Sequence, residues 1–521
     1  MPVQLDDLRE ATRDGMALAY WAARQPDVPA IVSPHGDRTF AALNARANAL
    51  ARALRSRGLV PGDAIALLVG NRPEFAEVVA AAQRAGLRFT PVNWHLTGDE
   101  AGYVVDDCDA KAFVADARYA SSAARAADCA PGARVRLAVG GAIDGFERCD
   151  DVVAGYDDSD LDDPVVGSSM LYTSGTTGRP KGVRRKATPS AVGNLFRYRA
   201  GEDVHLCTGP LYHAAPLAFS LVSPLHAGVG VVVMDGWDAR ETLALVARHR
   251  VTHSHMVPTM FHRLLALPDD VRAGADVSSL RLVLHGAAPC PVHVKQAIID
   301  WWGPVLLEYY AATEGLGTFV TSEEWLTRPG TVGKPFVPGS IRVLDEHGDD
   351  VPPGVVGTVY LKSLPGARFE YHHDPVKTES AYRGDFFTLG DVGRLDEDGY
   401  LYLTDRSSEL IISGGVNIYP AEVEAELLAH PAVADAAVIG VPDEDLGETV
   451  MAVVEVRDGV ETSDALAEEL VAFCRDRIAH YKCPRTVDFV DALPRHDNGK
   501  LYRRLLRDRY RAAAVDAGGS S

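Results

Sequence analysis

The chain has 521 residues, of which 47% are hydrophobic and 24% are charged, and it is too long for one hydrophobic core. Its formal net charge of −20 argues against a general affinity for nucleic acids, because their phosphates would be repelled. We therefore expect a soluble globular protein of two or more domains that has no nucleic-acid partner.

The compartment and the membrane topology follow from three features of the sequence. The N-terminal residues MPVQLDDLRE lack the basic and apolar regions of a secretory signal. The most membrane-like stretch, 217–234, is interrupted by Pro224, Gly228 and Gly230, so a helix, a turn and a buried strand explain it better than a spanning helix. The seven cysteines form no CxxC pair. These features predict a cytoplasmic protein without integral membrane association.

Short apolar runs alternate with amphipathic helical stretches over the first part of the chain. Apolar runs bounded by Gly or Pro are typical of buried strands in layered α/β sheets. We therefore expect a large N-terminal α/β domain over residues 1–404. The runs that indicate strands are AIALLVGN (64–71), KAFVAD (111–116), GVVVMD (230–235) and LRLVLHG (280–286).

The pattern changes near the end of this domain. SIRVLDEHGDDVPPGVVGTVYLKS is typical of two strands joined by a turn, and DVGRLDEDGYLYLTD is typical of a hairpin that turns at Asp398-Gly399. These stretches predict a β-rich subdomain over about 338–404.

Beyond Asp405 the pattern resets and predicts a separate, small α+β domain over 407–521. Its expected strands are VADAAVIGV, TVMAVVEV and TVDFV. A helix is expected to open near Pro420, and a second to run from about Ser463 to His480.

The stretch LYTSGTTGRPKGV, residues 171–183, is a short apolar strand followed by a loop of Gly and hydroxyl residues that ends in Lys181. Gly175 and Gly178 allow the backbone to approach a ligand, and amides, hydroxyls and an ammonium all donate to phosphate oxygens. The loop is not a Walker A motif, because Gly182 stands where Ser or Thr would bind magnesium. It therefore predicts a phosphate site unlike that of kinases and GTPases.

This loop resembles the phosphate-binding loop of the adenylate-forming superfamily, which includes acyl-CoA synthetases, firefly luciferase and the adenylation domains of peptide synthetases. The look is closest to bacterial fatty-acyl-CoA ligases. An ordered set of motifs over nearly the whole chain is a more specific signal than one loop. The further motifs are PLYHA (210–214), HGAAP (285–289), EYYAATE (308–314), LGD (389–391), DR (405–406), IISGGVNIYP (411–420) and PRHDNGK (494–500).

The resemblance implies ATP, Mg²⁺ and coenzyme A as ligands and assigns residues by position. Glu314 would hold the magnesium ion, and Thr313 would contact the α-phosphate. Lys500 would stabilise the charge that develops during adenylation. His213 would act as a gate between the acyl pocket and the pantetheine tunnel. The other residues implied to bind nucleotide or coenzyme A are Thr173, Ser174, Gly175, Thr176, Thr177, Gly178, Lys181, Gly286, Ala287, Ala288, Glu308, Tyr309, Tyr310, Ala311, Asp391, Arg406, Gly414 and Gly415.

Several of these roles are specific in the family. Tyr310 would stack on adenine opposite a wall formed by residues 286–288. Asp391 would accept hydrogen bonds from both ribose hydroxyls, since a carboxylate has two acceptor oxygens. Arg406 would bind ribose and phosphate from the other side. The hinge at 405–406 would let the C-terminal domain exchange Lys500 for the loop at 414–415 between two half-reactions.

Departures from the family pattern leave alternatives open. Ala311 replaces a Gly, Leu389 replaces a Thr and Ser407 replaces a Lys, which leaves room for a homologue that only thioesterifies a supplied acyl-adenylate. A peptide-synthetase adenylation domain is disfavoured, because no carrier domain follows Lys500. A luciferase-like oxygenase shares the motifs, and a catalytically dead nucleotide sensor would be expected to have lost Lys500 or Glu314.

The acyl pocket is expected near residues 213–221, 255–261 and 308–319. Small residues beside two large apolar ones suggest a roomy apolar cavity for a fatty, steroid-like or terpenoid acid. We therefore predict an ATP-dependent acyl-CoA ligase that forms acyl-AMP and pyrophosphate and then transfers the acyl group to coenzyme A. Whether the chain forms a homodimer is left open, and no residue is assigned as the base for the coenzyme A thiol. The pocket residues are Ala214, Ala215, Ala218, Gly317, Phe219 and Leu316.

Overall fold

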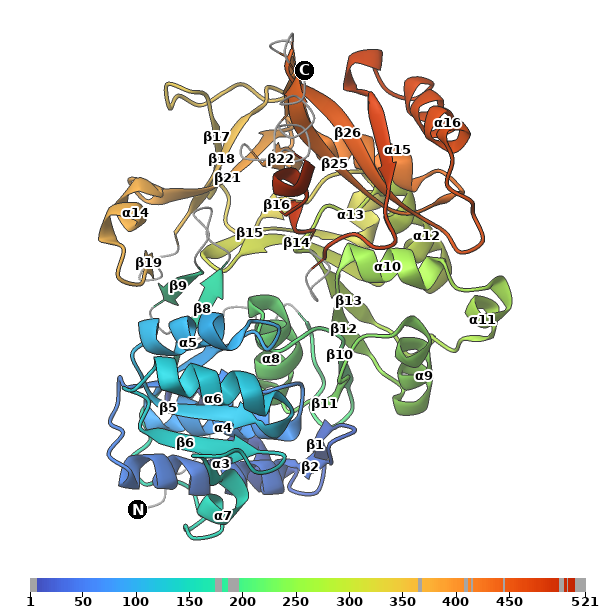
Figure 1. The fold of residues 1–521 in the computed structure, drawn as a ribbon. Helices are drawn as coiled ribbons and strands as arrows, with labels where there is room; N and C mark the ends of the chain where they lie inside the picture. The colour runs from blue at the N-terminus through green and yellow to red at the C-terminus, as the bar shows by residue number, and fades with distance from the viewer. Residues whose placement is uncertain are drawn as a thin grey trace.

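The computed structural model describes residues 7–173, 180–185, 196–363, 368–406, 411–413, 416–443, 446–495, 501–503 and 505–510. The described residues form four sheets (Figure 1). The four strand runs named above all form strands, within three residues of the expected bounds. Two short helices, α1 (Leu8–Arg13) and α2 (Ala17–Arg24), precede the first sheet.

The first sheet has the strand order β19-β9-β8-β4-β3-β5-β6-β7. Its strands from β8 through β4 to β7 are parallel, and β9 and β19 add antiparallel edges. The strands are β3 (Ala64–Leu68), β4 (Arg88–Pro91), β5 (Ala110–Asp116), β6 (Val135–Val139), β7 (Glu147–Arg148), β8 (Ser168–Thr173), β9 (Lys181–Arg185) and β19 (Phe369–Tyr371).

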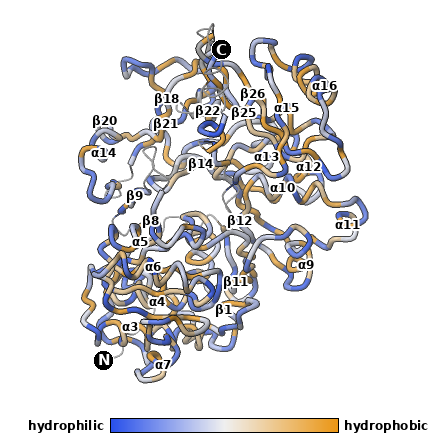
Figure 2. The backbone as a smooth tube through the Cα atoms, viewed as in Figure 1, coloured by the Kyte–Doolittle hydropathy of each residue, from blue (hydrophilic) through white to orange (hydrophobic). Residues whose placement is uncertain are grey.

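Helices cover both faces of this sheet because alternate side chains of a strand point to opposite faces. Ile65 and Leu67 of β3 belong to one buried cluster with α3 and α4, whereas Ala66 and Leu68 belong to another with α5 and α6. Hydrophobic and hydrophilic residues alternate along α3, α4 and α6 (Figure 2). The helices are α3 (Phe40–Ser56), α4 (Pro73–Ala85), α5 (Gly98–Asp107), α6 (Ala120–Cys129) and α7 (Cys149–Val153).

The second sheet has the order β16-β15-β14-β13-β12-β10-β11-β1-β2 and is parallel from β14 to β1. Buried residues of β1, β10 and β11 share one cluster with α3 and α4, so the two sheets are joined through a common core. Its strands are β1 (Pro29–Val32), β2 (Arg38–Thr39), β10 (Val204–Cys207), β11 (Gly230–Val233), β12 (His253–Met256), β13 (Leu282–His285), β14 (Leu306–Ala312), β15 (Gly315–Thr321) and β16 (Lys334–Pro335).

The stretch 217–234 is a helix, a turn and a strand, as expected: the π-helix η2 (Pro216–Val222), then α8 (Ser223–His226), then β11. Among the described residues, no helix has the length and the apolar content that crossing a bilayer requires. The remaining helices beside this sheet are α9 (Ala239–His249), α10 (Pro258–Leu265), α11 (Asp269–Gly274), α12 (Val292–Trp302) and α13 (Ser322–Thr327).

The third sheet is the predicted β-rich subdomain, and its pairings are antiparallel. Gly399 has a φ of +81°, which a glycine adopts without strain, and it turns the chain between β21 and β22 at the expected place. The elements are β17 (Ile341–Leu344), β18 (Gly357–Lys362), α14 (Pro375–Ser380), β20 (Tyr382–Arg383), β21 (Phe386–Leu395) and β22 (Leu401–Arg406).

The fourth sheet lies in the C-terminal part, next to α10 and α12 (Figure 1). The imidazole Nε2 of His262 on α10 lies 2.7 Å from the carbonyl oxygen of Ala434 on β25, which joins the two parts. The elements are β23 (Ile411–Ser413), β24 (Val416–Ile418), α15 (Pro420–Leu428), β25 (Val433–Asp443), β26 (Gly447–Val456), α16 (Asp464–Arg475) and β27 (Thr486–Phe489).

The expected helix from Ser463 to His480 is too long by one turn. The side chain of Ser463 accepts a hydrogen bond from the amide of Leu466 and begins the helix as predicted. The helix ends at Arg475 because the Cys474 carbonyl accepts the amides of both Arg477 and Ile478 and closes the last turn. A separate 3₁₀ turn, His480–Lys482, follows.

Candidate active site

The predicted site residues fall into those that the structure describes and those that lie outside the described residues. Thr173 ends β8 and Lys181 begins β9, at the two sides of the expected phosphate-binding loop. Arg406 is described in its backbone only. The predicted residues outside the described ones are Ser174, Gly175, Thr176, Thr177, Gly178, Gly414, Gly415 and Lys500.

A group of charged side chains lies beside Lys181. The Lys181 ammonium is 3.9 Å from Oδ2 of Asp374, and the Asp374 side chain also caps α14 by accepting the amide of Lys377 at 3.0 Å. Glu314, which is 9% exposed, accepts a hydrogen bond of 3.1 Å from the hydroxyl of Tyr371. Thr313 and Glu314 form the turn between β14 and β15. This hairpin tip faces Lys181, Lys377 and Arg185, which are here called the cationic group.

The cations of this group disfavour one another's charge. Burial and the neighbouring Lys181 ammonium lower the pKa of Lys377 to about 8, although Asp374 and Glu314 oppose the shift. Burial likewise lowers the pKa of Arg185, and the negative charge of Glu314 opposes this shift. Crowded cations that disfavour one another are stabilised when a phosphate binds between them.

A pH dependence follows from Lys377. The ammonium is charged below pH 8 and neutral above it, so the affinity for ATP is expected to fall as pH rises through 8. The KM for ATP, followed by pyrophosphate release between pH 7 and 9.5, should rise about 10-fold in the wild type. Lys377→Arg should flatten this rise, since a guanidinium keeps its charge. An identical pH profile in the variant would assign the titration to another group.

The hydroxyl of Tyr310 donates a hydrogen bond of 2.6 Å to Oδ2 of Asp391 on β21. Asp391 is 6% exposed. Asp391 is paired with Arg406 across β21 and β22, so the backbone of Arg406 lies opposite this carboxylate. Tyr310 and Glu314 flank one hairpin tip, and each is tied to the chain segment 371–391 through one hydrogen bond. The structure thus brings Tyr310 and Asp391 into contact and places Thr313 and Glu314 on the turn that follows β14, whereas their nucleotide contacts stay predictions.

A β-bulge gives Tyr310 its position. The pairing of β14 with β15 shifts register between Tyr310 and Ala311, and Gly317 is the unpaired residue on β15. A Cβ at Gly317 would lie 2.7 Å from the Tyr310 ring, so the ring needs glycine there. Bulges commonly aim side chains beside active sites. Gly317, predicted as a small pocket residue, therefore makes room for the aromatic ring.

The segment after β13 holds the residues predicted to form a wall opposite Tyr310, and the structure places Gly286 against Tyr309. A Cβ at Gly286 would lie 2.4 Å from the carbonyl oxygen of Tyr309, so only a glycine at this position lets the backbone come so close to β14. Ala287 is exposed and has a φ of +67°, a conformation that L residues rarely adopt. Such strain is concentrated at ligand sites. Ala288 is half-buried beside it.

Glu308 lies in the interior, away from the edge where Tyr310 meets Asp391. Its Oε2 is 2.6 Å from the ammonium of Lys295 on α12, and both side chains are nearly fully buried. Burial raises the pKa of Glu308, and the Lys295 ammonium opposes this. The Lys295 ammonium also lies 4.7 Å from the centre of the Trp325 ring. This pair indicates a structural role for Glu308; its nucleotide contact stays a prediction.

Lys295→Met is expected to lower the free energy of unfolding by about 3–5 kcal/mol, because it leaves a buried carboxylate without its cation. The double variant Lys295→Met and Glu308→Leu should recover most of the loss, since no charge then remains buried. Urea unfolding followed by fluorescence measures both. Equal losses in the single and double variants would contradict this account of the pair.

Tyr309 points to the opposite face of β14 from Glu308 and Tyr310. Its hydroxyl lies 3.0 Å from Nε2 of His255, and its ring centre lies 5.2 Å from that of Phe219. Burial lowers the pKa of His255 to about 3, so this ring is neutral. Phe196 packs on Phe219. Tyr309, His255, Phe219 and Phe196 are here called the aromatic cluster; the first three come from the segments predicted to line the acyl pocket, and Phe196 does not.

His213 follows a segment that is fixed by a residue the sequence did not indicate. The buried side chain of Asn71 donates to the carbonyls of Gly209 and Met234 and accepts the amide of Leu211. His213 is half-buried, and its ring centre lies 4.4 Å from that of Tyr212. Asn71 therefore positions the PLYHA motif; the gating role of His213 stays a prediction.

Sequence reasoning also missed Tyr371, Asp374 and Lys377. They lie in EYHHDPVKTES, which belongs to none of the motifs that carried the resemblance. The signal available was local: Asp-Pro before a short helical stretch is typical of a helix N-terminus. Only the pairing of β19 with β9 brings this segment to Lys181.

Comparison with known proteins covers nearly the whole chain. The sequence pattern described as AMP-binding enzyme matches residues 18–366, and that of the AMP-binding enzyme C-terminal domain matches residues 422–500. The chain belongs to the AMP-binding enzyme family. This confirms the resemblance to the adenylate-forming superfamily, within which the family is that of AMP-forming acyl-CoA synthetases, acid–thiol ligases that act on a carboxylic acid.

Individual relatives extend over the full length of this AMP-binding enzyme. The feruloyl-CoA synthase of Amycolatopsis sp is 34% identical over 95% of this chain and 99% of that protein. The long-chain-fatty-acid–CoA ligase FadD13 of Mycobacterium tuberculosis is 32% identical, with coverage of 96% and 98%. The structure of the anthranilate CoA ligase AuaEII in complex with anthranoyl-AMP superposes with a TM-score of 0.87 at 26% identity, covering 96% and 98%. The predicted fold class is thereby confirmed.

Proposed function

We propose that this ligase joins a bulky, mainly apolar carboxylic acid to coenzyme A in two steps. In the first step, a carboxylate oxygen attacks the α-phosphorus of ATP, which gives acyl-AMP and releases pyrophosphate. In the second step, the sulfur of coenzyme A attacks the acyl carbon, which gives the thioester and releases AMP. The observation that carries the proposal is the β14–β15 hairpin tip, which reaches a cationic group at one end and the Asp391 carboxylate at the other.

The cationic group would bind the phosphates. Lys181 and Lys377 compensate the charge of the pyrophosphate as it leaves, and positioned charges of this kind supply most of the catalysis in phosphoryl chemistry. A magnesium ion fits the Glu314 carboxylate, a hard oxygen donor that is 9% exposed, and when bound it would supply further neutralisation of the phosphates. Thr313 on the same turn would donate its hydroxyl to the α-phosphate.

The other end would hold the adenosine. Tyr310 offers a ring face that a base can stack on, with residues 286–288 opposite. Asp391 can keep its bond to Tyr310 and still accept from the ribose hydroxyls, because a carboxylate has about four acceptor positions. Arg406 would approach from the strand beside Asp391. In this proposal β14 and β21 would organise the adenosine site.

The two steps would use different positions of the C-terminal domain. β22 ends at Arg406, and the next described strand, β23, belongs to another sheet, which supports a hinge at 405–406. The contact between His262 and Ala434 would have to break when the domain turns. Lys500 would serve adenylation, and the loop at 414–415 would line the route of the pantetheine in the second step.

A ring-bearing acid is favoured over a straight chain. The aromatic cluster supplies flat faces and edges, which pack well on another ring. Feruloyl-CoA synthase and the anthranilate ligase are named for aromatic acids. FadD13 is named for long-chain fatty acids, so a fatty acid is the second candidate.

The test is a panel of acids assayed with ATP and coenzyme A, in which pyrophosphate and thioester are measured separately. The panel holds hydroxycinnamic, benzoic, steroid-like, long-chain fatty and acetic acids. We expect thioester from the ring-bearing acids with a kcat/KM at least about 10-fold above that of the fatty acid, the discrimination an apolar pocket provides. Preference for the fatty acid would overturn the ring assignment alone.

Other outcomes distinguish the remaining alternatives. Pyrophosphate without thioester would overturn the coenzyme A step. Thioester only from supplied acyl-AMP would replace the proposal by that of a homologue specialised for thioesterification. Neither product with any acid, despite ATP binding, would indicate a nucleotide sensor.

A further inference from the structure

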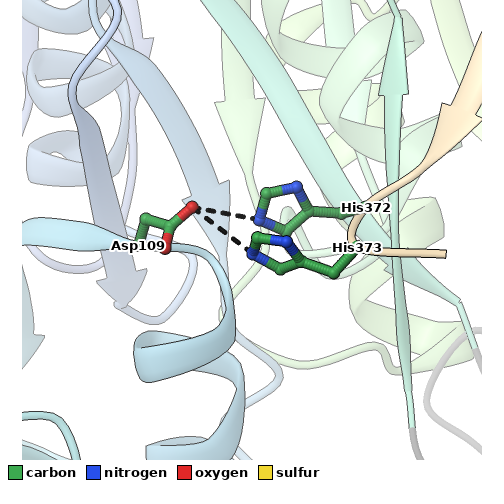
Figure 3. A group of neighbouring side chains, drawn as sticks. All are labelled: Asp109, His372 and His373. Carbon is green, nitrogen blue, oxygen red and sulfur yellow. Dashed lines mark ion pairs between the residues drawn. The ribbon is translucent and has the colours of Figure 1, made fainter. Parts of the chain in front are cut away.

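Three potential metal ligands meet outside the proposed active site. Oδ2 of Asp109 lies 3.3 Å from Nε2 of His372 and 3.6 Å from Nε2 of His373 (Figure 3). Asp109 lies between α5 and β5, and the two histidines follow β19. Within the part of the chain that the structure describes, this is the one group of three or more His, Cys, Asp or Glu residues with ligand atoms close enough to hold an ion.

The spacing fits a tetrahedral ion. With metal–ligand distances of about 2.0–2.2 Å, two ligands of a tetrahedral site lie roughly 3.3–3.6 Å apart. The two edges from Asp109 have these lengths. One ligand atom of each residue lies within 4.8 Å of the others, so the exposed His373 needs to move by only about 1 Å to close the third edge.

Two of the three residues adopt an unfavourable backbone conformation. Asp109 has a φ of +57° and His373 a φ of +58°, in the left-handed region that side chains other than glycine disfavour. The turn at His373 brings the two imidazole centres to 3.8 Å of each other. Backbone strain outside glycine is concentrated at ligand sites, and here it occurs at two of three members of one cluster.

The ligand chemistry selects the class of ion. The side chain of His372 is only 4% exposed. Two imidazoles and one carboxylate suit zinc and its neighbours rather than magnesium. Arg88, whose Nη2 lies 3.8 Å from Oδ2 of Asp109, opposes a second cation.

We propose that Asp109, His372 and His373 form a binding site for a divalent transition-metal ion of the zinc type, with three protein ligands and a fourth position open to water. The site would clamp the α5–β5 turn onto the segment after β19. The amide of His372 donates to the carbonyl of Gly182 at 2.7 Å, and Asp374, the next residue after His373, pairs with Lys181. The ion would therefore brace one wall of the cationic group without belonging to it.

The test measures zinc binding to the full chain without a histidine tag, by calorimetry in excess Mg²⁺ and without ATP. Excess Mg²⁺ occupies carboxylate sites and leaves imidazole sites to zinc. We expect one zinc ion more per chain in the wild type than in Asp109→Asn. Loss of an outer partner already weakens metal affinity by about 10–100-fold, so loss of a direct ligand in Asp109→Asn or His373→Gln should cost more than about 100-fold.

The design keeps the result interpretable. Asp109 and His373 are more than half exposed, so their variants are expected to fold, whereas His372→Gln replaces a buried side chain and serves as a third comparison. His347, which is 76% exposed and remote in sequence, gives the matched control His347→Gln, with binding unchanged. Zinc titrations that are the same in the wild type, Asp109→Asn and His373→Gln would overturn the site. Since no substrate is used, this outcome is separate from any test of the ligase activity.

Discussion

Replacing Lys500 by alanine is expected to slow acyl-adenylate formation by about 10²–10³-fold, the usual cost of removing one positioned donor from a developing oxyanion. The rate of thioester formation from supplied acyl-AMP should stay within about twofold of the wild type, because the lysine would act only on the phosphorus-bound oxygens. Pyrophosphate release measures the first step, and thioester from acyl-AMP and coenzyme A measures the second. Lys500 lies outside the described residues, so this prediction rests on the PRHDNGK motif.

The control for this variant is Lys111→Ala, which removes an exposed lysine from β5. It should leave both half-reactions unchanged. Equal losses of both half-reactions in Lys500→Ala would mean that the residue binds nucleotide in general or supports the fold. No loss in either would remove it from the site.

Replacing Glu314 by glutamine is expected to reduce adenylation by about 10²-fold or more, since a metal ion on transferring phosphates stabilises the transition state by several kcal/mol. Glutamine keeps the size of the side chain and can still accept the hydrogen bond from Tyr371, but it removes the charge that attracts a hard cation. A titration of Mg²⁺ against the rate should show a raised requirement.

Glu323→Gln on α13 is the matched control, because Glu323 is exposed and follows the same hairpin. It should behave as the wild type. A Glu314→Gln variant with an unchanged Mg²⁺ requirement and a lowered melting temperature would instead assign the carboxylate a structural role through Tyr371.

The sequence predicted the layered fold because its strands are short apolar runs bounded by turn residues, and such patterns depend on local composition alone. Asp398-Gly399 is one example, since the turn requires the positive φ that the structure shows. The end of α16 was placed one turn too late, because the closing hydrogen bonds to Cys474 leave no signature in composition.

The residues of the candidate site that lie in family motifs were predicted from the sequence. Tyr310, Glu314 and Asp391 lie in recognisable motifs; Tyr310 contacts Asp391, and Glu314, on the turn that follows β14, is bound by Tyr371. Lys377 and Asn71 act through long-range contacts, and one sequence carries no signal for such pairings. Glu308 belongs to a motif and nevertheless lies in the interior, because Lys295 on helix α12 supplies its counter-ion there, a long-range contact that the motif does not indicate.

The most direct test of the central claim is a crystal structure with a non-hydrolysable acyl-adenylate analogue. The account predicts adenine against Tyr310, ribose hydroxyls on Asp391 and the phosphate side beside Lys181 and Glu314. An analogue bound elsewhere, or bound with these four side chains remote from phosphate and ribose, would contradict it.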